Sequence, residues 1–211
     1  MGHPGSPYTL AQAQAHLKAS VVGNRITFCR ADPLAFLAQA DQVYDVAVLA
    51  HCIWYFASPS VLLTTLRALS SRTKRICLAE YALTASDPSM FPHVLAALTQ
   101  ASLECRKPDS EANIRTVVSP ARIKEIAAEA ELVLLGEYVL KPLAKMYDGR
   151  WEVGMVLGKG FKQELALVKD ERDRAVIEAL RDATLASRES LTLAGVNVTT
   201  MDVWSGVFTE L

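Results

Sequence analysis

The chain has 211 residues and a formal net charge of -1, with 51% hydrophobic and 21% charged residues. This length suits one domain with a sizeable core, and the hydrophobic fraction excludes a disordered chain. Because the sequence has no basic excess, no apolar run of about 18 residues and no secretory leader, we expect no nucleic-acid partner, no membrane segment and a cytoplasmic location.

Helix and strand patterns alternate along the first half of the chain. Three helices are predicted, because each begins with a capping residue followed by residues that favour helix. The first covers residues 9–19 with Thr9 as its cap, the second begins at Asp32-Pro33, and the third begins at Ser58-Pro59. Apolar runs predict three strands, the second of them buried on both faces: residues 25–30, 45–50 and 75–79. This alternation indicates βαβ units and a parallel sheet.

The second half of the chain continues this mixture of elements. Helices are expected at residues 94–103, 119–130 and 169–188. Strands are expected at residues 132–140 and 151–157 and in the tail 198–208. We interpret 132–140 and 151–157, joined by a loop with Asp148-Gly149, as an antiparallel pair at a sheet edge. No linker is visible, so we expect a single domain over residues 1–211.

The cysteines show no metal-ligand spacing and no CxxC pair: Cys29, Cys52, Cys77 and Cys105. The first three lie in apolar runs, where a free cysteine behaves as a small buried hydrophobic residue. We therefore expect reduced structural thiols and no metal site.

Ligands of open parallel sheets bind outside the carboxyl ends of the strands. This rule selects three places here: Ala31-Asp32, Ala50 to Tyr55, and Glu80-Tyr81. An aspartate directly after a strand can accept hydrogen bonds from a ligand amine such as that of adenine. Asp32 can equally cap the helix that starts at Pro33, and one residue can do both.

The run from Asp45 to Phe56 begins as a strand and ends in histidine and aromatic residues. Aromatic rings at a strand end can line a pocket for a cofactor or a flat substrate. His51 is a candidate general base, because the ordinary pKa of histidine lies close to physiological pH. The alternative, which spacing alone favours, is that Trp54 and Tyr55 cover the sheet edge and His51 is structural.

Other polar residues stand out in the second half of the chain. His93 follows Pro92 at a helix start, where it would either line a pocket or serve the helix terminus, which is the more common role. Arg115, beside Asn113, would clamp an anionic group or form a surface ion pair, again the more common role.

Two consecutive segments resemble the fourth and fifth strands of class I S-adenosylmethionine-dependent methyltransferases: YDVAVLAHCIWYFASPSVLLTTLRAL and KRICLAEYAL. More narrowly, the chain is similar to a fungal methyltransferase-like group. Supporting segments are GSPYTLAQAQAHL, RITFCRADPLAF, PHVLAALTQASLE, NIRTVVSP and TMDVWSGVF, so the resemblance extends from Gly5 to Phe208. It implies an α/β fold with a Rossmann-like, mostly parallel sheet, an antiparallel C-terminal strand and no counterpart of the family's first two strands.

The resemblance also implies a site. The cofactor side is expected to comprise Ala31, Asp32, Ala50, His51 and Cys52, with Asp32 near the adenine. The substrate side is expected to comprise Trp54, Tyr55, Glu80, Tyr81 and His93. Trp54 and Tyr55 would lie next to the sulfonium or the acceptor, since aromatic faces attract cations.

The family function is transfer of the methyl group of S-adenosylmethionine to a small molecule, with His51 as base or orienting group. The family's glycine-rich E/D-x-G-x-G-x-G loop matches no segment of this chain. Three alternatives therefore stand beside the active enzyme. The chain is a fragment of a full-length methyltransferase; or it is a silent homologue that forms a homo- or hetero-oligomer completing the sheet; or it catalyses another reaction with His51 or His93 as acid or base.

Overall fold

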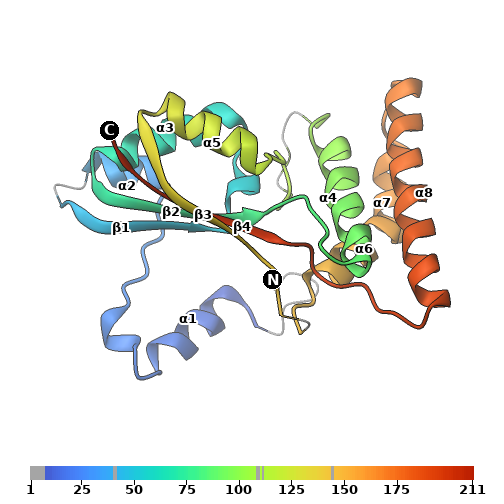
Figure 1. Ribbon diagram of the computed structural model, residues 1–211, viewed down its shortest axis with the longest axis horizontal. Helices are drawn as coiled ribbons and strands as arrows, with labels where there is room; N and C mark the ends of the chain where they lie inside the picture. Colours follow the sequence, from blue (N-terminus) through green and yellow to red (C-terminus); the bar gives the residue numbers. More distant parts are fainter. Residues whose placement is uncertain (1–7, 40–41, 108–109, 111, 144) are drawn as a thin grey trace. The chain divides into compact units, whose positions relative to one another are not determined.

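The computed structural model describes residues 8–39, 42–107, 110, 112–143 and 145–211 (Figure 1). The chain divides into two compact units, residues 1–39 and residues 40–211. The single-domain organisation stays a prediction.

The first unit contains α1 (Leu10–Lys18), the 3₁₀ helix η1 (Gly23–Arg25) and α2 (Pro33–Gln39). α1 begins at a capping box, in which Thr9 and Gln12 each accept a hydrogen bond from the other's backbone N–H. The prediction of a strand at residues 25–30 is wrong. Residues 26–30 follow η1 and form no strand. Strand-like composition alone does not make a strand where no ladder partner is available.

The second unit is built on a four-stranded sheet with the order β1-β2-β4-β3. Its strands are β1 (Tyr44–Ala50), β2 (Thr73–Tyr81), β3 (Leu132–Leu140) and β4 (Val203–Glu210). β1 pairs with β2 in parallel, whereas β4 is antiparallel to both β2 and β3. The predicted α/β fold with an antiparallel final strand is therefore confirmed, in a mixed sheet in which β4 runs against the other three strands.

Helices form two groups around this sheet. α3 (Pro59–Ser70) and α5 (Pro120–Glu129) cover one face, where α3 contacts β2 and α5 contacts β3 (Figure 1). A second group packs together beside the strand ends: α4 (Phe91–Glu104), α6 (Asp148–Leu157), α7 (Lys159–Leu165) and α8 (Glu171–Leu193). Two short 3₁₀ helices complete the unit: η2 (Ile53–Tyr55) and η3 (Pro88–Met90). None of the described helices is long and apolar enough to cross a membrane.

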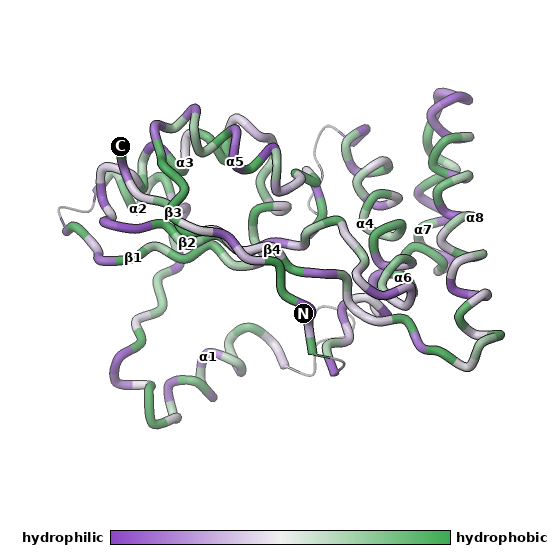
Figure 2. The backbone as a smooth tube through the Cα atoms, in the orientation of Figure 1, coloured by the Kyte–Doolittle hydropathy of each residue, from purple (hydrophilic) through white to green (hydrophobic). Residues whose placement is uncertain are grey.

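The core of the sheet lies under α3 and α5. Its central side chains belong to β2 and β4 and are almost completely buried: Ile76, Leu78, Trp204 and Phe208. The second helix group has its own apolar contacts, including Val153 and Val156 of α6 against Ala96 of α4. Along α8 hydrophilic residues alternate with hydrophobic ones (Figure 2), as expected of a helix with only one packed face.

The strand predicted at 151–157 is wrong, and so is its antiparallel pairing with 132–140. These residues belong to α6, and β3 pairs with β4 instead. β-branched residues and a tryptophan favour a strand locally, but the buried positions Gly149, Glu152, Val153 and Val156 have helical spacing. Packing against α4 therefore decides the conformation of this segment.

Two burial predictions are also wrong. β1 is the edge strand of the sheet, and Val46 and Val48 on it are 45% and 67% exposed, so it is not buried on both faces. All four cysteines are free, but Cys29 is exposed and Cys52 and Cys77 are only half-buried. An apolar run in the sequence indicates a hydrophobic environment on average. Whether its side chains are buried depends on which helices and strands cover them.

Ser58→Ala is expected to lower the free energy of unfolding of the second unit by about 1 kcal/mol. The Ser58 side chain accepts a hydrogen bond from the Val61 N–H and so caps α3, as the Ser-Pro pair predicts. Urea unfolding followed by circular dichroism measures this change. Ser58→Asp supplies another capping oxygen and should retain most of the stability; an equal loss in both variants would contradict the capping role.

Candidate active site

The candidate site lies where β1 and β2 end side by side. Ala50 of β1 is in register with Ala79 of β2, and the His51 N–H extends this ladder by donating to the Ala79 carbonyl at 2.9 Å. His51 has a φ of 50°, and Leu83, just after β2, has a φ of 57°. Such backbone is costly for residues other than glycine, and the surrounding contacts must maintain it.

Glu80 is the polar centre of the site and is only 1% exposed. Its Oε2 accepts hydrogen bonds from the N–H groups of Ile53 at 3.0 Å and Trp54 at 3.4 Å, and its Oε1 accepts one from the Tyr81 N–H at 3.0 Å. The carboxylate therefore fastens η2 to the end of β2. Since these contacts use both oxygens inside the protein, Glu80 lies behind the site surface.

His51 is the polar side chain of the site that reaches the surface. Its side chain is 36% exposed, and Nδ1 lies 3.4 Å from Glu80 Oε1. The two atoms are at ion-pair distance without good hydrogen-bond geometry, and Nδ1 is buried. The Glu80 carboxylate raises the pKa of His51, partial burial opposes this, and the negative charges of Asp148 and Glu152 add to the rise.

This raised pKa gives a prediction for the pH dependence of stability. Because the folded-state pKa of His51 lies above 6.5, protonation stabilises the folded chain; the contribution is complete below 6.5 and is lost as pH rises through the folded-state value. The stability difference between the native chain and His51→Asn should therefore shrink between about pH 6 and pH 8. Urea unfolding across this range measures it, and a difference that grows with pH would contradict the assignment.

The Tyr81 ring lies at the centre of an aromatic group. Its centroid is 4.5 Å from that of His51, 5.5 Å from that of Trp54 and 5.0 Å from that of His93. Burial raises the pKa of Tyr81, and the charges of Asp148, Glu152 and Glu80 raise it further. Tyr81 is therefore a neutral phenol.

His93 is completely buried and held at both nitrogens. The Met201 N–H donates to Nδ1 at 3.0 Å, so Nε2 carries the proton and donates to Glu152 Oε2 at 3.0 Å. His93 therefore supports the Tyr81 ring from behind in a single tautomer.

Trp54 anchors the neighbouring loop. It is 2% exposed, its Nε1 donates to the Val118 carbonyl at 3.1 Å, and its own carbonyl accepts from the N–H groups of Arg115 and Thr116. Arg115 Nε donates to the Ala112 carbonyl. These contacts place the Trp54 ring beneath the site surface.

The remaining predicted residues differ in their surroundings. Tyr55 is 48% exposed and Cys52 is half-buried, and partial burial raises the pKa of both side chains. Ala50 is exposed at the end of β1. Asp32, which follows Ala31, belongs to the first unit, where its Oδ1 accepts from the Ala35 N–H at 2.9 Å and caps α2. The cofactor and substrate roles of the predicted residues stay predictions.

The structure brings five predicted residues together: His51, Trp54, Glu80, Tyr81 and His93. It adds two carboxylates that sequence reasoning missed, Asp148 and Glu152 of α6. The available signal was their spacing of four residues, which places both on one face of a helix. The interpretation of 151–157 as a strand concealed it.

Comparison with known proteins shows what the chain is similar to. No family model matches the chain. Two curated proteins of Diaporthe leptostromiformis, methyltransferase phomM and methyltransferase phomM', are each 31% identical to it over 240 residues, which cover 95% of this chain and 61% of theirs. The chain thus spans less than two thirds of the length of these relatives.

A solved structure has a similar fold. The crystal structure of a cyclopropane-fatty-acyl-phospholipid synthase-like protein from Lactobacillus casei ATCC 334 matches with a TM-score of 0.79 and 25% identity, covering 97% of this chain and 70% of that chain. By sequence the chain is similar to the methyltransferases phomM and phomM' over nearly its whole length, and by fold it is similar to this synthase-like protein. These similarities agree with the methyltransferase resemblance of its sequence.

Proposed function

We propose that this chain takes part in methyl transfer from S-adenosylmethionine to a small-molecule acceptor, with the reacting groups at the ends of β1 and β2. The observation that carries the proposal is the pairing of partly exposed His51 with buried Glu80 at this edge of the sheet. A histidine held by a carboxylate is a common form of general base.

The residues present fit the charged part of the cofactor. Glu80, Asp148 and Glu152 produce a negative potential at the site, since each raises the pKa of His51 and of Tyr81. A sulfonium cation is favoured by such a potential and by aromatic faces. When bound, S-adenosylmethionine supplies an electrophilic methyl group.

The chain's own residues would orient the acceptor and take its proton. Displacement at a methyl group depends mainly on alignment, so positioning contributes most of the expected rate enhancement. Because His51 Nδ1 is buried toward Glu80, we assign proton transfer to Nε2. Glu80 keeps the ring in this orientation and increases its basicity.

Calorimetric titration with S-adenosylmethionine and S-adenosylhomocysteine tests the proposal. Micromolar binding, around -8 kcal/mol, is the expected result. Near-ultraviolet circular dichroism serves as the control that the protein is folded. No detectable heat on a folded sample, at a concentration that would reveal micromolar binding, would overturn the proposal.

The open edge of β1 supports a second candidate function. β1 has a strand neighbour on one side only in the described sheet, and its Val46 and Val48 are exposed. An apolar edge strand is a template for pairing with another chain, so a homo- or hetero-oligomer would complete the sheet. Size-exclusion chromatography with light scattering checks this. A monodisperse monomer across the micromolar range would contradict self-association.

The finer assignments also belong to this proposal: membership of a fungal methyltransferase-like group and a cytoplasmic location. The two Diaporthe leptostromiformis relatives support the first. Cell fractionation with an antibody against this chain tests the second, and recovery in a membrane or secreted fraction would contradict it.

A further inference from the structure

The site has a second layer of acidic side chains, on α6. Asp148 and Glu152 lie four residues apart in this helix and therefore on the same face. The Asp148 carboxyl is close enough to the Tyr81 hydroxyl to raise its pKa. Glu152, only 7% exposed, accepts a hydrogen bond from fully buried His93, whose ring meets the Tyr81 ring edge-on. α6 thus holds the Tyr81 ring through His93.

The backbone fixes α6 closely in this place. Gly149 approaches the segment before β4 so tightly that an added Cβ would lie 2.5 Å from the Thr199 carbonyl oxygen. Thr200 Oγ1 accepts from the Gly149 N–H and donates to the Met146 carbonyl. The next residue, Met201, supplies the N–H that fixes His93. One short segment therefore orients both α6 and His93.

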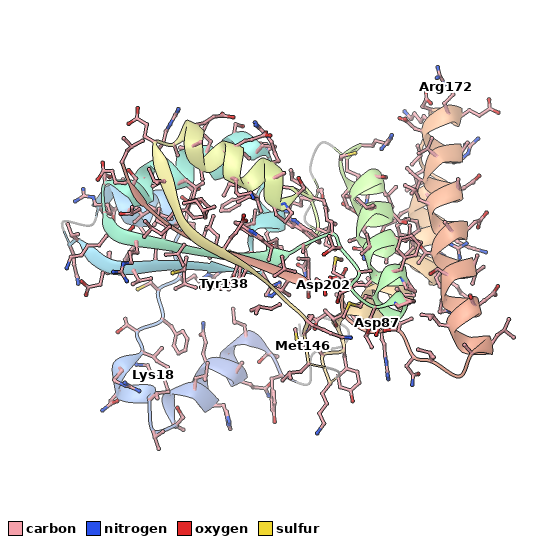
Figure 3. All side chains as sticks on the ribbon, viewed as in Figure 1. Lys18, Asp87, Tyr138, Met146, Arg172 and Asp202 are labelled. Carbon is pink, nitrogen blue, oxygen red and sulfur yellow. The ribbon has the colours of Figure 1, made fainter. Side chains whose placement is uncertain are left out.

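The start of β4 is held in turn by Asp202. Its carboxylate accepts hydrogen bonds from the Ser86 N–H and hydroxyl and from the Thr84 hydroxyl, which ties the segment to the loop after β2. Figure 3 shows Asp202 where the sheet meets the second helix group, near Met146. The position of α6 relative to Tyr81 is thus determined by the loop that follows Tyr81 itself.

The contacts continue from Tyr81 to His51. The centroids of the two rings are 4.5 Å apart, and the Tyr81 ring contacts the rings of both His51 and His93. The titratable groups facing His51 are Glu80, Tyr81, Tyr55 and Cys52 from the sheet side, and Asp148 and Glu152 from α6. In the described part of the chain Glu80 and Glu152 each have one basic side chain within ion-pair distance, His51 and His93 respectively.

We propose that Glu152 is a positioning residue, which acts through His93 to hold the Tyr81 ring, so that this ring keeps His51 in the orientation that faces Glu80. The catalytic consequence rests on the proposed function. The positioning itself is a property of the folded chain and can be measured without activity.

NMR of the histidine side chains tests the positioning. The native chain should show a His93 Nε2–H resonance protected from exchange, and Glu152→Gln should shift it and weaken its protection. The pKa of His51 should fall more in Glu152→Gln than in Asp148→Asn, because both variants remove a negative charge that acts on His51 but only Glu152→Gln also loosens the His93 support of Tyr81. Glu189→Gln, on the exposed surface of α8, is the matched control and should leave both signals unchanged.

Kinetics separate this proposal from the proposed function. If the native chain transfers methyl groups, Glu152→Gln should lower kcat about tenfold or more, with the KM for S-adenosylmethionine within about twofold. If it does not, a larger fall in the pKa of His51 in Glu152→Gln than in Asp148→Asn would still support positioning while the function fails. A fall in folded Glu152→Gln no larger than that in Asp148→Asn would overturn the positioning proposal, whatever the activity.

Discussion

On the proposed function, His51→Asn is expected to lower kcat for methyl transfer by about 10²–10⁴-fold, the usual contribution of a general base. Asparagine suits this test because it tolerates the φ of 50° at this position better than most residues do. Since the His51 side chain is partly exposed and Glu80 keeps its three backbone hydrogen bonds, the fold should be little affected. A radiolabelled methyl-transfer assay and a thermal unfolding curve measure the two effects.

His16→Asn is the matched control, because His16 is exposed on α1 in the first unit. It should leave kcat unchanged. If His51→Asn loses activity only in proportion to its loss of folded protein, His51 is structural and the assignment as base is wrong. Activity that rises with pH through the raised pKa of His51 in the native chain would add independent support.

Glu80→Ala is expected to lower the free energy of unfolding of the second unit by about 3 kcal/mol or more. The substitution removes the acceptor of three backbone N–H groups, those of Ile53, Trp54 and Tyr81, at a position that is 1% exposed. Buried donors without partners cost about 1–3 kcal/mol each. Urea unfolding with linear extrapolation measures the loss.

Two further variants test whether the loss of the Glu80 hydrogen bonds causes this destabilisation. Glu80→Gln keeps one acceptor oxygen and the side-chain volume, so it should cost less stability while still lowering the pKa of His51. Glu210→Ala, at the exposed end of β4, should change stability by less than about 0.5 kcal/mol. A Glu80→Ala variant as stable as Glu210→Ala would show that Glu80 does not anchor η2.

The sequence by itself determined the helix starts and most of the sheet. Thr9, Asp32 and Ser58 cap the helices that follow them, as their positions predict, because a cap depends on residues within one turn. The strands β1, β2, β3 and β4 follow apolar runs that are visible locally. The order of these runs also carried the resemblance to methyltransferases.

Only the tertiary structure decided the conformation of α6 and the second layer of the site. Residues 151–157 have a composition that suits a strand, and packing of Val153 and Val156 against α4 made them helical. The contacts that hold the site join residues far apart in the chain: Ile53 to Glu80, 27 residues apart, and His93 to Met201, 108 residues apart. Local propensity and periodicity describe neighbours in sequence, so they predicted His51, Glu80 and Tyr81 at strand ends. Asp148 and Glu152 join that site because the chain topology, rather than any local pattern, brings α6 against Tyr81 and His93.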